Sequence, residues 1–157
     1  MASTLELLNA ATLAIETNPP LLIVSQASTQ SLANTGFTAI TWPSPSTDTY
    51  SGWSSGHPTR YTPTVSGIYL VIGSIGFANN ATGGRVAQLC QNGVGNVINQ
   101  SSAGSASATL NTVTQVTAMI QCNGSTDYWE LYSDQNSGGA LNSVVGTTSM
   151  TAVLIHR

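Results

Sequence analysis

Short apolar stretches separated by polar turns run through the chain from residue 21 to its end. The stretch 67–78 is rich in β-forming residues, and the polar residues 79–84 separate it from a second stretch at 85–91. Asn92-Gly93 follows directly, and this pair is typical of tight hairpin turns. A strand, a turn, a second strand and a tight turn predict antiparallel β structure, and the remaining sequence repeats the pattern.

The pattern predicts eight to ten short strands and contains no internal repeat. The segments concerned are 21–28, 38–42, 60–64, 67–78, 85–91, 94–100, 108–121, 127–133 and 149–155. Alternation along 108–121 predicts one buried and one exposed face. Gly73 and Gly76 lie inside a predicted strand, which indicates a bulge or a close neighbour. Residues 44–58 and 101–107 are predicted loops, and the whole pattern favours a sandwich or jelly roll.

The last predicted strand, 149–155, is apolar although it lies at the end of the chain, where chains usually fray. Such a strand is stable only when it is paired and covered. We therefore expect it inside a sheet, near an oligomer axis.

The first twenty residues differ from the rest and form a separate arm, followed by one domain at 21–157. Ser3-Thr4-Leu5-Glu6 fits a capping box, and Asn18-Pro19-Pro20 ends the helical pattern. Leu5, Leu8 and Ile15 recur at helical spacing and are the candidate anchor residues. Their apolar face is expected either to pack on the chain's own domain or to dock onto a neighbouring subunit.

Composition favours self-association. Charged residues make up 6% of the chain, against about 25% in ordinary soluble domains. Lysine is absent, and 61 of the 157 residues are Ser, Thr, Asn or Gln. So weakly charged a surface repels its own copies poorly, which predicts a built-in partner. The alternative is an isolated Ser/Thr-rich β domain.

The same composition argues against several partners. The net charge is −3 and the three arginines are scattered, so there is no basic stripe for nucleic acid. No apolar run approaches the ~20 residues that a membrane span needs. The N-terminal residues carry Glu6 and no positive cluster, unlike a secretory signal.

Catalytic and metal-binding motifs are missing from the sequence. The two histidines are His57 and His156, and no nucleophile elbow or zinc motif accompanies them. Residues 134–138 begin like a calcium loop, but Val145 replaces its closing glutamate, so a turn is favoured. We expect no enzyme activity, no cofactor and no metal. Cys90 and Cys122 are interpreted as buried free thiols, with a single bridge as the alternative.

An aromatic cluster in the predicted loop 44–58 is the one candidate ligand site. Tyr50, Trp53 and His57 lie there among hydroxyl-bearing residues. Aromatic rings with polar neighbours can bind sugars by stacking and hydrogen bonding. The competing interpretation, which we favour, is that Trp53 fills the core or a subunit interface, because large aromatic side chains are usually buried.

Three segments together resemble a known family. They are Gly67-Ile-Tyr69 with 77–83, Arg85 and Asn92-Gly93; then 127–131 with 135–141; and finally 150–155. This pattern resembles the tumour-necrosis-factor/complement-globular-head jelly roll over residues 25–157. The variants Asn-Ala-Thr-Gly-Gly-Arg and Gln-Asn-Ser-Gly-Gly are similar to those of virion surface proteins of tailed bacteriophages.

The resemblance implies an all-β, antiparallel, ten-stranded jelly roll that assembles as a compact homotrimer. On this basis Tyr69, Val153 and Ile155 are the candidate trimer-interface residues. The expected role is a structural protein on the head or tail surface of a virion, attached by its arm to the major capsid protein or another virion protein. The alternatives are a host-recognition head that binds surface glycan through 44–58 and 101–107, and a cellular cytokine-like ligand.

Overall fold

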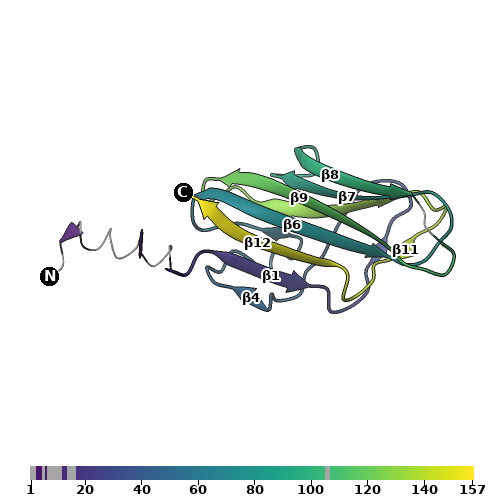
Figure 1. Cartoon of the computed structure of the whole chain (residues 1–157), viewed down its shortest axis with the longest axis horizontal. Helices are drawn as coiled ribbons and strands as arrows, with labels where there is room; N and C mark the ends of the chain where they lie inside the picture. Colours follow the sequence, from purple (N-terminus) through teal and green to yellow (C-terminus); the bar gives the residue numbers. More distant parts are fainter. Residues whose placement is uncertain (1–2, 5, 7–11, 14–16, 105–106) are drawn as a thin grey trace.

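The computed structural model describes residues 3–4, 6, 12–13, 17–104 and 107–157. In this part of the chain, ten strands form two antiparallel five-stranded sheets, and two further strands pair with each other. The sheets face one another across a shared core (Figure 1). The predicted fold class, an all-β jelly-roll sandwich, is confirmed.

The first sheet contains the longest strands. Its strands, in spatial order, are β4 (Thr47–Asp48), β1 (Leu21–Ser25), β12 (Ser149–His156), β6 (Gly67–Phe77) and β9 (Thr112–Cys122). The C-terminal strand β12 lies between β1 and β6 and pairs with both. The apolar end of the chain is therefore paired on both sides, as predicted.

The second sheet is built around β10. Its strands are β3 (Thr38–Ala39), β10 (Trp129–Gln135), β7 (Gly84–Gln91) and β8 (Val97–Gly104), in that order, and β5 (Arg60–Tyr61) also pairs with β10. The short strands β2 (Ser31–Leu32) and β11 (Leu141–Asn142) form a separate pair.

Alternating side chains fill the space between the sheets. Along β9 every second residue from Thr112 to Cys122 is buried, which confirms the predicted alternation, although the strand begins at Thr112 and not at 108. Trp129 lies against the rings of Tyr61 and Tyr69, with ring centres 5.0 and 5.3 Å apart. Cys90 and Cys122 are buried free thiols.

Gly73 and Gly76 of β6 mark close approaches of neighbouring segments. A Cβ at Gly73 would lie 2.6 Å from Leu131 Cδ1, and one at Gly76 would overlap Thr147 Oγ1 and lie 3.0 Å from Val144 Cβ. Neither position has room for a methyl group without movement of a neighbour. The prediction of close neighbours is confirmed at both.

Two predicted connections are wrong. Residues 101–104 were expected in a loop, but they extend β8, because each pairs with a residue of β7. The Asn92-Gly93 hairpin is longer than two residues, because Gln91 N donates to Asn96 O and the connection runs from 92 to 96. Backbone pairing overrides the loop-like Ser/Ala/Gly composition.

A buried arginine holds the polar turn 79–84. Arg85 is fully buried, and its guanidinium donates to the carbonyls of Asn80, Thr82 and Gly84 at 3.2, 3.0 and 2.9 Å. The turn is thus a pinned connection between β6 and β7, which agrees with its interpretation from the sequence.

The described residues of the arm confirm its capping box. Ser3 N donates to Glu6 Oε2 at 2.6 Å, and Glu6 N donates to Ser3 Oγ at 3.2 Å. Thr4, Glu6, Thr12, Leu13 and Thr17 have helical backbone. The candidate anchors Leu5, Leu8 and Ile15 lie outside the described residues. The arm joins the domain beside the end of β12, where Leu154 N donates to Pro20 O at 3.0 Å.

Candidate functional site

The outward face of the first sheet carries rows of side chains in register across four strands. The row nearest the arm runs from β1 to β9 and consists of Leu21, Val153, Leu70 and Met119. Each of these is partly or fully exposed, whereas its neighbours along the strand are buried. An apolar band therefore crosses the sheet on the side away from the core.

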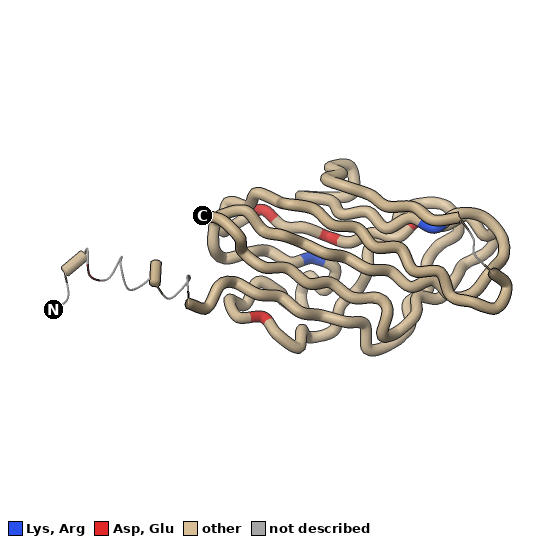
Figure 2. Tube along the Cα trace, in the orientation of Figure 1, with Lys and Arg blue, Asp and Glu red and all other residues tan. Residues whose placement is uncertain are grey.

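The polarity of this outward face changes along the strands. The next row is Ile23, Thr151, Ile72 and Thr117, and the one after it is Ser25, Ser149, Ser74 and Gln115. Across these three rows the side chains change from aliphatic, nearest the arm, to hydroxyl and amide groups, and none of the residues in the three rows is charged. Figure 2 shows how few charged residues mark the trace as a whole.

The three candidate interface residues do not share one surface. Val153 belongs to the apolar row, and Ile155 is 46% exposed at an irregularity in the pairing of β12 with β6. Tyr69 is 1% exposed, and its hydroxyl donates to Val65 O at 2.7 Å. Because successive residues of a strand face opposite sides, Leu70 reaches the surface where Tyr69 cannot.

The loop 44–58 is organised by one carboxylate and contains β4, which the sequence did not predict. Asp48 accepts from Gly52 N, Trp53 N and the Tyr61 hydroxyl at 3.2, 2.9 and 3.0 Å. Burial, followed by the charge of Asp48, raises the pKa of Tyr61 above its ordinary range. The aspartate therefore anchors the loop to the sheet.

The predicted aromatic cluster does not form one exposed platform. Trp53 is half-buried against the core and pairs with Tyr61, and Tyr50 is also half-buried, whereas His57 is exposed. The packing interpretation therefore fits Trp53 best.

A pocket of about 240 Å³ lies beside His57 in the same loop. It is lined by Ser51, Gly52, Ser54, His57, Arg60, Thr62 and Thr64. No Phe, Tyr or Trp lines it, so its chemistry is that of hydroxyls, one imidazole and one guanidinium. The sequence analysis missed Arg60 and the threonines, because they follow the loop and reach the pocket only when the chain turns back at 54–60.

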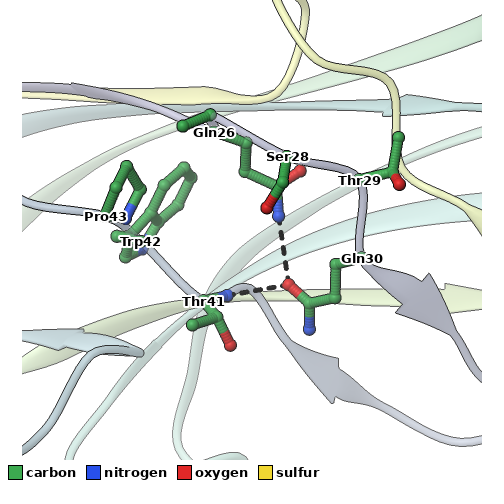
Figure 3. A pocket seen from close by; sticks show the side chains of 8 residues that line it. Gln26, Ser28, Thr29, Gln30, Thr41, Trp42 and Pro43 are labelled. Carbon is green, nitrogen blue, oxygen red and sulfur yellow. Dashed lines mark hydrogen bonds between the residues drawn. The ribbon is translucent and has the colours of Figure 1, made fainter.

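A second pocket, of about 350 Å³, lies between residues 26–30 and 41–43. Figure 3 shows Gln26 and Gln30 meeting in it: Gln26 Nε2 and Thr41 N both donate to Gln30 Oε1, at 3.0 and 2.9 Å. Ser143, which does not line the pocket, donates from its Oγ to Gln26 Oε1 at 2.6 Å. Trp42 and Pro43 form one wall. This pocket is neutral, and its carboxamides are engaged with each other.

The described residues contain neither a metal-binding cluster nor a membrane-spanning helix. In this part of the chain, no three His, Cys, Asp or Glu side chains gather as a metal site would require. The described helical residues include no helix of the length and apolarity that crossing a bilayer requires.

Comparison with known proteins establishes the fold. The sequence matches no protein-family model and no curated protein. The structure is similar to that of murine APRIL at pH 8.0, with a TM-score of 0.65 and 15% identity over 87% of this chain and 98% of that one. Murine APRIL at pH 8.5 gives 0.63 and 12%, with the same coverage.

A third similar structure is Eiger TNF from S. frugiperda. It has a TM-score of 0.56 and 13% identity over 87% of this chain and 93% of that one. The chain therefore has the TNF-like jelly-roll fold that its sequence resemblance implied. At these identities the likeness concerns architecture alone.

Proposed function

We propose that the chain is a non-enzymatic structural protein of a virus particle, most simply a tailed bacteriophage, and that it works as a homotrimer on the particle surface. The observation that carries the proposal is the uncharged, partly aliphatic outward face of the β1–β12–β6–β9 sheet. Removing such a face from water is favourable and requires no charge to be desolvated.

Self-association is supported both by the exposed aliphatic side chains of that face and by the absence of charged residues from its three rows. The apolar row is exposed to solvent in the single protomer; it consists of Leu21, Val153, Leu70 and Met119. The family that the sequence resembles assembles as compact trimers, which supports three copies rather than two. A trimer also answers the solubility problem posed by 6% charged residues.

The virion location is supported by sequence and by the position of the arm. Residues 80–85 and 135–139 are similar to phage versions of the motif. The arm enters the domain beside the apolar row, and its Leu13 is 59% exposed in the protomer. We infer that residues 1–20 attach the trimer to the major capsid protein or another virion protein.

Two experiments test this function. Sedimentation of the purified chain is expected to give a trimer, and a stable monomer at micromolar concentration would contradict the assembly. Added to undecorated capsids of the parent phage, the full chain is expected to bind and a chain lacking 1–20 is not. Full decoration by the truncated chain would overturn the anchoring role.

Host recognition is the second candidate function. It is favoured by the pocket of about 240 Å³ that His57 and Arg60 line, which we call the Arg60 pocket. A receptor-binding head would bind host cells, and His57→Ala, an exposed change, would weaken that binding. Electron microscopy of intact particles separates the two roles, because a decoration protein covers the capsid and a recognition head lies at the tip of a tail fibre or spike.

A further inference from the structure

The three arginines of this lysine-free chain are in three different situations. Arg85 is buried and its guanidinium is engaged by three carbonyls. Arg157 is the exposed last residue. Arg60 is half-buried in the wall of a pocket, and its guanidinium makes neither a hydrogen bond nor an ion pair with the residues that the structure describes.

The guanidinium of Arg60 is held in place without being neutralised. It lies over the ring of Tyr128, 4.6 Å from the centroid, which fixes the side chain through a cation–π contact. Its Nε is buried and has no partner. A buried donor left unpaired costs free energy, so this guanidinium has hydrogen-bonding capacity that the described residues do not satisfy.

The neighbouring carboxylate is already occupied. Glu130 lies directly opposite Arg60 in the pairing of β10 with β5. Its two oxygens accept from Thr59 Oγ1 at 2.7 Å and from the Tyr132 hydroxyl at 2.6 Å, and it forms no ion pair with Arg60. Asp48, the other nearby acid, is engaged by Gly52, Trp53 and Tyr61.

We propose that this pocket binds the carboxylate of an acidic sugar, such as a uronic or sialic acid. The planar fork of the guanidinium matches a carboxylate in a bidentate arrangement. The hydroxyls of Ser51, Ser54 and Thr62 and the ring of His57 surround it and pair with sugar hydroxyls as donors or acceptors. About 240 Å³ is below the usual range of drug-sized sites and suits one monosaccharide.

Phosphate fits the same pocket less well. It carries nearly twice the charge of a carboxylate, and the pocket offers one guanidinium, no lysine and no helix N-terminus. Asp48 and Glu130 behind the wall would repel a dianion more strongly than a monoanion. The site stands independently of the trimer, because every group in it comes from one protomer.

The direct test is an NMR titration of the full chain with four probes: glucuronic acid, glucose, acetate and inorganic phosphate. Glucuronic acid is expected to shift the Arg60 Nε–H signal and the amides of 51–62, with a dissociation constant on the order of millimolar. Acetate is expected to shift the same signals more weakly, and glucose is expected not to bind detectably. Glucose binding as tightly as glucuronic acid, or phosphate binding more tightly than either, would overturn the proposal.

Matched variants separate the guanidinium from net charge. Arg60→Gln is expected to weaken glucuronic acid binding at least about tenfold, whereas Arg157→Gln, which removes the same charge elsewhere, changes it less than about twofold. Arg60→Lys keeps the charge without the fork and is expected to bind at least about threefold more weakly than wild type. His57→Ala, at an exposed position, provides a variant with an intact fold and is expected to weaken binding too. Unchanged affinity in Arg60→Gln, or in both Arg60→Lys and His57→Ala, refutes the assignment.

Discussion

Met119→Glu tests the proposed assembly face at its most exposed aliphatic point. Met119 lies on β9, at the end of the apolar row, and is 68% exposed in the protomer. A charged residue there faces water when the chain is a monomer, so the substitution is expected to change the protomer's own stability by about 0.5 kcal/mol or less. In a trimer that buries the row, the same carboxylate would be removed from water.

The expected effect follows from area. Full burial of a methionine side chain contributes about 1.5–3 kcal/mol. Burying the 68% that the protomer leaves exposed is therefore worth about 1–2 kcal/mol per copy, and about 3–6 kcal/mol for three copies. This corresponds to a loss of about 100- to 20,000-fold in the trimer association constant, before the cost of burying the charge is added.

Leu110→Glu is the matched control. Leu110 is 67% exposed, but it lies in the connection before β9 and off the sheet face. Sedimentation at a series of concentrations is expected to show dissociation of Met119→Glu and a trimer for Leu110→Glu, with both variants folded. Equal sedimentation of both variants and wild type as trimers would show that the row is not the interface.

Three further predictions concern the fold. Gly76→Ala is expected to lower the free energy of unfolding by about 1–3 kcal/mol, because the new Cβ would meet Thr147 and Val144. Gly95→Ala is the control and is expected to change the free energy of unfolding little, because no atom lies within 4 Å of its new Cβ. Equal effects of the two substitutions in denaturant unfolding would contradict the packing argument. Asp48→Asn is expected to cost about 1–3 kcal/mol, because the negative charge is lost and one of the two accepting oxygens becomes an NH2 group that cannot accept a hydrogen bond. An unchanged urea midpoint would rule out the anchoring role. The free energy of unfolding is expected to fall as the pH rises above about 9, since burial raises the pKa of the Cys122 thiol to about 12 and raises the pKa values of Tyr61, Tyr69 and Tyr132. These groups ionise in the unfolded chain at a lower pH than in the folded chain, so each lowers the free energy of unfolding by up to about 1.4 kcal/mol per pH unit. Urea titrations at about pH 8 and about pH 10.5 measure the loss of stability, and equal urea midpoints would contradict the prediction.

The sequence was informative wherever periodicity alone determines structure. The alternation along β9 predicted which residues are buried, from Thr112 to Ile120, because a strand has two faces and one of them meets the core. The apolar 149–155 predicted a strand inside a sheet because an apolar chain end is stable only when it is paired and covered. The two-residue strands β2, β4 and β11 are too short to produce a period, and only their partners define them.

The candidate sites could not be predicted correctly because they depend on how the strands pair and how the loops turn. Tyr69 was predicted as an interface residue, but in the protomer its side chain is buried and Leu70 is the residue that faces outward. The row from Leu21 to Met119 brings together four residues that are far apart in the sequence, and cross-strand register is not written in local composition. The Arg60 pocket likewise depends on the backbone turn at 54–60, which the polar composition of that segment indicates only as a loop.

The gradient along the outward sheet face has a consequence for symmetry. Near a rotation axis each side chain meets copies of itself, so a charged residue would meet an identical charge. Aliphatic groups at the arm end have no such conflict. At the other end, the hydroxyls of Ser25 and Ser149 can each donate to one copy and accept from another. Every position in these three rows is therefore compatible with its own image, and contact between copies through them would be nearly insensitive to salt concentration.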